Sequence, residues 1–324
     1  MQQTLPDIDP GAPLFFLVNG ASGRNDAQAK RELIEAALKP AGRRSELRIV
    51  AQPGELHRVA REAAIAARRC RTALVGVGGD GTLNAVARAA HAEGCAMGVV
   101  AQGTFNYFAR SHGLPTDPAQ AIDTLLRCTP VPVQVATVNG ELFLVNASLG
   151  LYPELLQDRE AYKSRFGRSR WVALLSTLAT LVHEHRQLGL HIEQGGAVRR
   201  LRTPTLFVGN NRLQLEQVGL PQAQALEAGR LAGVVLRPIG TLAMLWLLLR
   251  GAFGKLGDAD TVESFEFQRI VVRHWHPFGP RRVMVACDGE VSWMRGPLEF
   301  KVSPTPLYLL KPSAHEAASL PDAA

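Results

Sequence analysis

The sequence predicts an α/β domain built on a parallel sheet, followed by a β-rich domain that resembles a sandwich. Up to about residue 130, apolar runs of strand length alternate with helical stretches, and glycine-rich loops follow three of the runs. Such alternation is typical of a parallel sheet with both faces covered by helices. Beyond this point the segments become short, β-rich and separated by turns. We therefore expect an α/β domain over residues 12–130, a β-rich domain over 131–312 and a disordered tail over 313–324.

The expected strands of the first domain are buried apolar runs that end at turn-forming residues. They are Leu14–Asn19, Glu46–Val50, Thr72–Gly76 and Met97–Ala101. The expected helices are Ala27–Leu38 with Asp26 as its cap, Glu55–Arg68, Thr82–His91 and a short one within Phe105–Ser111. Ligands of parallel sheets bind beyond the carboxyl ends of the strands, which is where the glycine-rich loops begin.

The second domain has the pattern of an antiparallel sheet or sandwich interrupted by two helical stretches. Its expected strands are Val131–Val138, Glu141–Ala147, Leu188–Glu193, Arg199–Val208, Leu231–Pro238, Ser264–Val272, Arg281–Val285 and Leu298–Val302. The helical stretches, Trp171–His185 and Leu242–Phe253, are the most apolar of the chain. They fit either buried core helices or a face that touches lipid.

Composition indicates a globular protein with anionic partners. The chain of 324 residues is 46% hydrophobic and 20% charged, which allows two domains with a sizeable core. A net charge of +7 favours nucleotide phosphates, acidic lipid headgroups or nucleic acid. The four cysteines are widely spaced and read as reduced thiols. Because Asp7 and Asp9 contradict a signal peptide and the longest apolar run is short, we expect a cytoplasmic protein.

The segment Gly76–Asn84 (GVGGDGTLN) has the features of a phosphate-binding loop. Its glycines let the backbone approach phosphates closely, and the helix that follows offers free N–H groups and a partial positive charge. Asp80 would repel phosphates unless a cation lies between them, so a magnesium–nucleotide complex fits best. Two other interpretations are a dinucleotide fingerprint, which would need a ribose-binding acid after the next strand, and a purely structural turn.

Two further loops repeat this pattern, and a carboxylate pair lies in the second domain. Gly103–Asn106 (GTFN) follows the fourth expected strand, and Asn19–Gly23 (NGASG) follows the first. Cys287–Glu290 (CDGE) is first of all a hairpin turn. In a functional interpretation, Asp288 or Glu290 orients or deprotonates an attacking hydroxyl, because phosphoryl transfer depends more on positioning than on a strong base.

Together these segments resemble the diacylglycerol kinase catalytic domain of bacterial lipid kinases, which is shared with sphingosine and ceramide kinases. The resemblance extends from about Phe15 to Leu310 and depends on the order and spacing of three motifs: GGDGT at 78–82, GTxN at 103–106 and DGE at 288–290. It implies an N-terminal phosphofructokinase-like domain and a C-terminal β-rich domain, with ATP in the cleft between them. The activity that it implies is transfer of the ATP γ-phosphate to a hydroxyl of diacylglycerol or a related lipid, with Mg²⁺.

Site residues are carried over from the family by position. Those expected to bind the nucleotide are Asn19, Ser22, Gly23, Gly78, Gly79, Asp80, Gly81, Thr82, Leu83, Asn84, Gly103, Thr104 and Asn106. Glu290 is expected to accept the proton of the lipid hydroxyl, and Asp288 is expected to support either Glu290 or the metal. Asp80 is expected to organise the magnesium–ATP complex. In the sphingosine kinase branch the residue matching Asp80 is regarded as the base, so the choice between Asp80 and Glu290 stays open.

Departures from the family pattern keep two alternatives open. Gly20 replaces a usual proline, Tyr107 replaces an aspartate, no threonine follows the second strand, and Ala228 lies where bacterial members often have a metal-binding aspartate. These changes motivate a lipid- or nucleotide-binding regulator on the same scaffold. A kinase of a soluble hydroxyl substrate is the other alternative, since NAD kinase shares GGDGT, although GTxN and DGE fit it poorly.

The expected partners are ATP, a membrane lipid and the anionic inner face of the membrane. The run Arg159–Arg170 holds five basic residues and is one candidate for the membrane contact, although the residues favour a solvated helix face. No nucleic-acid-binding module is present, so we expect no nucleic-acid partner. The sequence leaves open whether the protein forms a homodimer.

Overall fold

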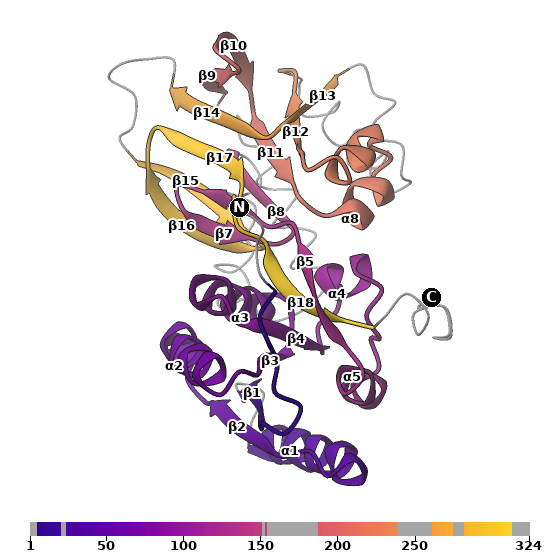
Figure 1. Cartoon of the computed structure of the whole chain (residues 1–324). Helices are drawn as coiled ribbons and strands as arrows, with labels where there is room; N and C mark the ends of the chain where they lie inside the picture. The colour runs from indigo at the N-terminus through magenta and orange to yellow at the C-terminus, as the bar shows by residue number, and fades with distance from the viewer. Residues whose placement is uncertain are drawn as a thin grey trace. The chain divides into compact units, whose positions relative to one another are not determined.

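The computed structural model describes residues 5–20, 24–150, 153, 187–238, 261–274 and 282–312 (Figure 1). These residues divide into two compact units. Unit 1 contains the chain up to Val135 together with the segment from Pro304 onward, and unit 2 is Ala136–Ser303.

Unit 1 is built on one six-stranded sheet. Its strands are β1 (Leu14–Asn19), β2 (Ser45–Val50), β3 (Ala73–Gly78), β4 (Ala96–Ala101), β5 (Thr129–Val133) and β18 (Leu307–Lys311). They lie in the order β2-β1-β3-β4-β18-β5. The first four strands pair in parallel, which confirms the predicted parallel-sheet domain.

Helices cover both faces of this sheet (Figure 1). They are α1 (Arg24–Leu38), α2 (Leu56–Arg69), α3 (Asp80–Glu93), α4 (Tyr107–Ser111) and α5 (Pro118–Leu125), with short 3-10 turns η1 (Lys39–Ala41) and η2 (Pro53–Glu55). On one face, apolar residues of β1, β3 and β4 form a core with Ile34 of α1 and Ile122 of α5. On the other face, α2 and α3 pack against each other and against the same strands. Helix α1 begins two residues before Asp26, so Asp26 lies inside the helix and the predicted cap there is wrong.

The C-terminal strand of the described chain returns to unit 1, which the sequence analysis did not anticipate. Strand β18 pairs in parallel with β4 at Leu309 and Met97, and antiparallel with β5 along its length. The predicted strand Val131–Val138 is in fact two strands, because β5 ends at Val133 in unit 1 and β6 begins at Ala136 in unit 2. The chain therefore crosses between the units twice, whereas the sequence suggested one boundary near residue 130.

Unit 2 consists of two antiparallel sheets. One has the order β10-β9-β14-β17-β6-β7 and the other β13-β12-β11-β8-β15-β16. The strands of the first sheet are β6 (Ala136–Val138), β7 (Glu141–Phe143), β9 (Leu188–Gln194), β10 (Ala197–Thr203), β14 (Arg269–His274) and β17 (Leu298–Val302). Those of the second are β8 (Asn146–Gly150), β11 (Thr205–Gly209), β12 (Leu231–Leu236), β13 (Val262–Phe267), β15 (Arg282–Cys287) and β16 (Glu290–Arg295).

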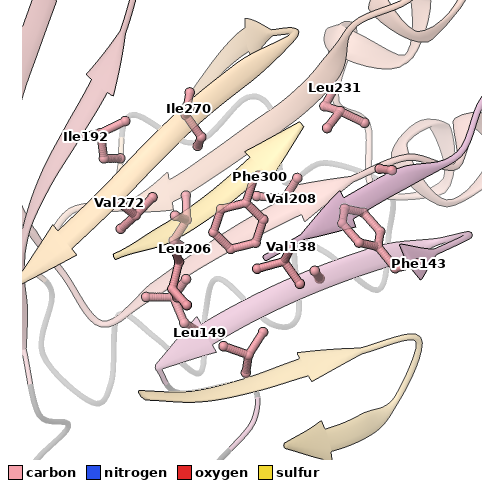
Figure 2. Packing of buried hydrophobic residues seen from close by; sticks show 14 of the residues in the cluster. Val138, Phe143, Leu149, Ile192, Leu206, Val208, Leu231, Ile270, Val272 and Phe300 are labelled. Atoms are coloured by element: carbon pink, nitrogen blue, oxygen red, sulfur yellow. The ribbon is translucent and has the colours of Figure 1, made fainter. Parts of the chain in front are cut away.

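A shared hydrophobic core makes these two sheets a sandwich (Figure 2). Val138, Phe143 and Phe300 from the first sheet pack with Leu149 and Leu206 from the second, among others. Fully burying a large apolar side chain contributes about 1.5–3 kcal/mol, so this core accounts for much of the stability of the unit. The β-sandwich expected for the second domain is confirmed.

Sandwich corners explain why several predicted strands are split. The predicted strand Arg199–Val208 becomes β10 in one sheet and β11 in the other, with the change at Pro204. The buried Thr203 hydroxyl donates to the Thr205 carbonyl at 2.6 Å and accepts from the Leu236 amide at 3.2 Å, which holds the corner. Pro204 lies at the change of sheet, and a proline inside a strand pattern argues against one continuous strand there.

Two short helical segments complete the described part of unit 2, α8 (Arg212–Gln217) and η3 (Pro221–Leu226). The stretches Trp171–His185, Leu242–Phe253 and Arg159–Arg170, and the expected tail 313–324, lie outside the described residues. Among the helices that are described, none has the length and apolar character needed to cross a membrane. All four cysteines are free thiols, as expected.

Candidate active site

The three loops predicted to bind phosphates begin at one edge of the unit 1 sheet. Strands β1, β3 and β4 are adjacent, with Val18 paired to Val77 and Gly78 paired to Ala101. Their carboxyl ends are therefore level, and the loops after Asn19, Gly78 and Ala101 start side by side. This arrangement is the one expected for a ligand site of a parallel sheet.

The turn from β3 into α3 requires glycine and leaves the helix N-terminus uncovered by side-chain caps. A Cβ on Gly78 would lie 2.8 Å from the Thr82 hydroxyl, and the Gly78 φ of +159° is one that other residues rarely adopt. Gly79 caps α3 without a side-chain hydrogen bond, and Asp80 is the first residue of the helix. The first turn of α3 therefore begins at this loop, and the dipole of a helix favours an anion at its N-terminus.

Backbone packs directly on backbone where the β3 and β4 loops meet. The Gln102 amide donates to the Gly78 carbonyl at 2.8 Å, and a Cβ on Gly103 would lie 3.1 Å from the Gly79 Cα. The Gly103 amide donates to the Asn106 side-chain oxygen at 2.7 Å, which closes the loop after β4. The Asn106 side-chain oxygen therefore has a structural role in this loop, and its role as a nucleotide ligand stays a prediction.

Side chains connect the loop after β1 to the turn between β3 and α3. The Asn19 amide donates to the Thr82 hydroxyl at 3.1 Å. From α1, the Lys30 ammonium donates to the Asn19 carbonyl at 3.3 Å, so a positive charge lies at the end of β1. Ser22 and Gly23, both expected near the phosphates, lie outside the described residues.

Other predicted nucleotide-binding residues differ in their exposure. Leu83 and Asn84 are buried, at 0% and 2% exposure, and Leu83 packs against Gly76 of β3. Thr104 is exposed, and Gly81 is partly exposed in the first turn of α3. Within unit 1, the surface available to a ligand is therefore formed by the loop backbone, Asp80 and Thr104 more than by the side chains of Leu83 and Asn84.

Two residues that the sequence analysis missed lie at this edge. Lys30 is one, and its signal was only its position on the helix that follows the first loop. Gln102 is the other: its side-chain oxygen is buried and accepts no hydrogen bond from the part of the chain that the structure describes. A buried polar atom without a partner is costly, and a bound ligand or water would relieve that cost. The sequence feature that could have indicated Gln102 is its position directly between β4 and Gly103.

In unit 2, the DGE motif forms the predicted hairpin between β15 and β16. Asp288 and Gly289 both have positive φ, 48° and 87°, and Cys287 pairs with Glu290. A two-residue Asp-Gly loop with this backbone is the turn that suits the strand twist. Glu290 is exposed at the start of β16.

The Asp288 carboxylate is occupied by the backbone of a neighbouring loop. It accepts from the amides of Leu144, Val145 and Asn146 at 2.7, 2.8 and 3.0 Å. Hydrogen bonds to a charged acceptor contribute roughly 1.5–3 kcal/mol each, so this contact fixes the turn firmly. Asp288 therefore stabilises the hairpin that carries Glu290.

The residues present fit a magnesium–nucleotide complex at unit 1 in one respect. Glycines at positions 78, 79 and 103 leave a side-chain-free backbone surface beside one carboxylate, Asp80. Protein-bound Mg²⁺ in nucleotide sites is often held by one or two carboxylates and by the phosphates themselves. No cluster of three or more His, Cys, Asp or Glu side chains exists among the described residues, so no dedicated metal cage is seen there.

Comparison with solved structures identifies the class of fold. The chain resembles the crystal structure of a diacylglycerol kinase from Bacillus anthracis strain Sterne, with a TM-score of 0.66, 18% identity, and coverage of 94% of this chain and 98% of that one. At this identity the likeness establishes the fold only. The protein thus has the two-part architecture of an α/β sheet unit and an antiparallel sandwich unit.

Comparison of sequences shows which proteins the N-terminal part of the chain resembles. Residues 13–138 match the diacylglycerol kinase catalytic domain. The chain is 39% identical over 145 residues to the "Probable lipid kinase YegS-like" of Pseudomonas aeruginosa, a match of 44% of this chain and 45% of the relative. It is 30% identical over 146 residues to the diacylglycerol kinase of Bacillus subtilis, covering 44% and 47%. Residues 13–138 therefore resemble the diacylglycerol kinase catalytic domain, and the chain spans only about half the length of the curated relatives it matches.

Proposed function

We propose that this protein is an ATP-dependent lipid kinase that phosphorylates a hydroxyl of diacylglycerol or a related lipid. The observation that carries the proposal is the glycine-lined edge of unit 1, where Gly79 and Gly103 meet backbone to backbone beside Asp80 at the start of α3. The matched catalytic-domain family supports a phosphotransferase. In this proposal unit 1 is a phosphofructokinase-like nucleotide domain.

Phosphate binding is assigned to unit 1. The first-turn amides of α3 and the backbone around Gly103 would donate to phosphate oxygens, and the Asn19–Thr82 contact would keep two of the loops together. Lys30 would add positive charge at the end of β1. Mg²⁺ held by Asp80 would neutralise charge on the phosphates. These groups position and stabilise the transferred phosphoryl group, which is most of what catalysis of this reaction requires.

Proton acceptance is assigned to Glu290. The lipid hydroxyl oxygen would bond to the γ-phosphorus as the bond from that phosphorus to the bridging oxygen of ADP breaks, and the hydroxyl proton would pass to the Glu290 carboxylate. Glu290 is suited to this role because it is exposed, whereas Asp288 is committed to three backbone amides. We therefore favour Glu290 over Asp80 as the base, since Asp80 lies at the phosphate-binding helix terminus.

The second metal site of some bacterial relatives has no counterpart in our proposal. Ala228 lies where the aspartate would be, and its neighbour Glu227 is engaged by Arg212. Tyr107, where the family has an aspartate, stacks on Phe105 with ring centroids 5.6 Å apart. These substitutions are the specific observation that favours the alternative, a lipid- or nucleotide-binding regulator with weak turnover.

Transfer of label from γ-labelled ATP into a lipid panel tests the proposal and separates the alternatives. The panel contains diacylglycerol, monoacylglycerol, phosphatidylglycerol, ceramide and a sphingoid base, with Asp80→Ala as the control protein. Label that enters one lipid, and is lost with Asp80→Ala, supports the kinase and gives its acceptor class. ATP binding without label in any lipid contradicts the proposal and favours the regulator or a soluble acceptor.

A further inference from the structure

One surface of unit 2 combines an exposed tryptophan with two arginines. Val283 and Val285 of β15 face the sandwich core, and Met294 of β16 packs against that core. Because side chains alternate along a strand, Trp293 and Arg295 face the opposite way. Arg282 is directly opposite Arg295 in the β15–β16 ladder and so lies on the same side. We call Trp293, Arg282 and Arg295 the hairpin face.

Trp293 is the most exposed large hydrophobic residue in unit 2 among those described, with 61% of its surface accessible. Single exposed apolar residues are common, but tryptophan is the type that most often marks an interaction surface. Its ring has an apolar body and a polar N–H, which suits the boundary between lipid tails and water.

Several arginines in the other sheet of unit 2 form ion pairs with acidic residues. Arg269, Arg273 and Arg199 form ion pairs with Glu299, Glu193 and Glu263 respectively. Within the described residues, neither Arg282 nor Arg295 has such a partner. Like charges directly opposite each other weaken a β ladder, so this pair has a cost in the free protein. An anion between the two side chains would remove that cost.

Hydrogen bonds from Asn139 hold the backbone at the end of β16, where Arg295 lies. The side-chain amide nitrogen of Asn139 donates to the carbonyls of Arg295 and Pro297 at 3.0 and 3.2 Å. The side-chain oxygen of Asn139 accepts from the backbone amide of Glu299 at 2.8 Å. This bracket anchors the end of β16 to β17. The hairpin face is therefore presented on a strand that is fixed at its far end.

A simpler explanation accounts for the arginines but not for the tryptophan. Strand β16 is at the edge of its sheet, and charged residues on an edge strand prevent pairing with other chains. A large exposed aromatic residue on the same strand has the opposite effect, because it favours association. The combination fits a surface that binds something anionic and partly apolar.

We propose that the hairpin face docks the protein on an anionic phospholipid surface, with Trp293 at the headgroup level and the Arg282–Arg295 pair on lipid phosphates. The proposal builds on the lipid kinase function, because Glu290 begins the same strand three residues before Trp293, roughly 10 Å away along the strand. By the same alternation the Glu290 side chain lies on the opposite side of the strand from Trp293, so docking would bring the hairpin that carries the proposed proton acceptor to the membrane without placing the Glu290 carboxylate on the lipid surface.

Binding to sucrose-loaded vesicles, measured by sedimentation without ATP, tests this proposal. The vesicles contain phosphatidylcholine and phosphatidylglycerol at about 7:3, or phosphatidylcholine alone. Each arginine near an anionic surface contributes about 1 kcal/mol, so Arg282→Gln with Arg295→Gln should weaken partitioning into the mixed vesicles about 30-fold. Trp293→Thr, which keeps a β-forming residue, should weaken binding to both kinds of vesicle.

Matched variants control for net charge and for exposed apolar surface. Arg269→Gln with Arg273→Gln removes the same charge from two arginines that already have acidic partners, and should weaken binding far less. Val198→Thr removes another exposed apolar residue, 60% accessible, on the edge strand β10, and should leave binding unchanged. Equal losses from both arginine pairs, or no loss from the hairpin-face variants, would overturn the proposal.

Two further outcomes would assign the hairpin face to another ligand. If the hairpin-face variants change the molar mass in solution but not vesicle binding, the face is a contact between copies of this chain. If inorganic phosphate binds to the arginine pair but vesicle binding is unaffected by its loss, the site takes free phosphate. Either result contradicts docking. Phosphorylation of a short-chain diacylglycerol in detergent micelles tests the kinase function separately, since micelle turnover does not require docking on a bilayer.

Discussion

The side-chain amide of Asn19 donates a hydrogen bond to the hydroxyl of Thr82 at 3.1 Å, although the two residues are 63 positions apart in the chain. This contact joins the end of β1 to the first turn of α3. Both residues belong to loops that the sequence predicts to bind phosphates, so the bond couples two parts of one proposed site within unit 1.

A double-mutant cycle measures this coupling. Asn19→Ala and Thr82→Val should each weaken ATP binding, measured by titration calorimetry, because each frees one loop from the other. The double variant should lose less than the sum of the two, with a coupling energy of about 1 kcal/mol, typical of one hydrogen bond. Strictly additive losses would show that the contact does not serve nucleotide binding.

Replacement of Gly103 should separate the two glycine loops. In Gly103→Ala the new methyl group would lie 2.8 Å from the Asn106 side-chain oxygen and 3.1 Å from the Gly79 Cα, so backbone has to move. We expect ATP affinity to fall by about tenfold or more, a change of about 1.4 kcal/mol. Gly54→Ala is the matched control, because a methyl group there meets nothing within 4 Å. Equal affinities of the two variants would refute the close packing.

Loss of the Asp288 carboxylate should destabilise unit 2. Asp288→Ala leaves the amides of Leu144, Val145 and Asn146 without their acceptor, and should lower the free energy of unfolding by about 2–4 kcal/mol in a urea titration. Asp288→Asn keeps one acceptor oxygen and tolerates the positive φ, so its loss should be smaller. A fully stable Asp288→Ala protein that has lost activity would instead indicate a direct catalytic role.

The stability of unit 1 should depend on the protonation of His112. Burial, with a smaller effect from the charge of Lys311, lowers the pKa of His112 to about 4 from a usual 6.5. Because the folded pKa is the lower one, the unfolded state binds the proton more readily. The contribution is complete above about pH 6.5 and is lost as the pH falls toward 4, with an upper bound of about 3 kcal/mol.

His112→Phe isolates this contribution. His112 meets Phe108 edge to face with ring centroids 4.8 Å apart, and phenylalanine can keep that contact without titrating. Denaturant midpoints between pH 4 and 7 should therefore vary less in the variant than in the parent protein. An unchanged slope would place the acid sensitivity elsewhere.

The sequence pattern predicted the elements whose type is indicated by a short run of consecutive residues. The runs Leu14–Asn19 and Met97–Ala101 correspond to β1 and β4 within one residue, because apolar strands of a parallel sheet are buried on both sides. The Asp288-Gly289 turn was predicted for a similar reason, since its backbone is set by two residues. The placement of the glycine loops at one sheet edge followed from the order of the strands.

What the sequence could not predict depends on contacts between distant residues. Strand β18 is short, and it lies beside β4 because it pairs with residues that are more than 200 positions away in the chain. The amides that occupy Asp288 are 142–144 positions from it. Lys30 and Gln102 carry no motif, and only the fold brings them to the edge where Asn19 and Gly103 lie.

Release of ADP in the presence of lipid is the most direct test of the proposed lipid kinase activity. With magnesium, ATP and diacylglycerol in detergent micelles, we predict ADP release that requires the lipid and yields one phosphorylated lipid per ADP. Asp80→Ala should lose this release together with ATP affinity, while Glu290→Gln should lose release and keep affinity. ADP release that is independent of lipid, or ATP binding with no release in the presence of any lipid acceptor, would contradict the account.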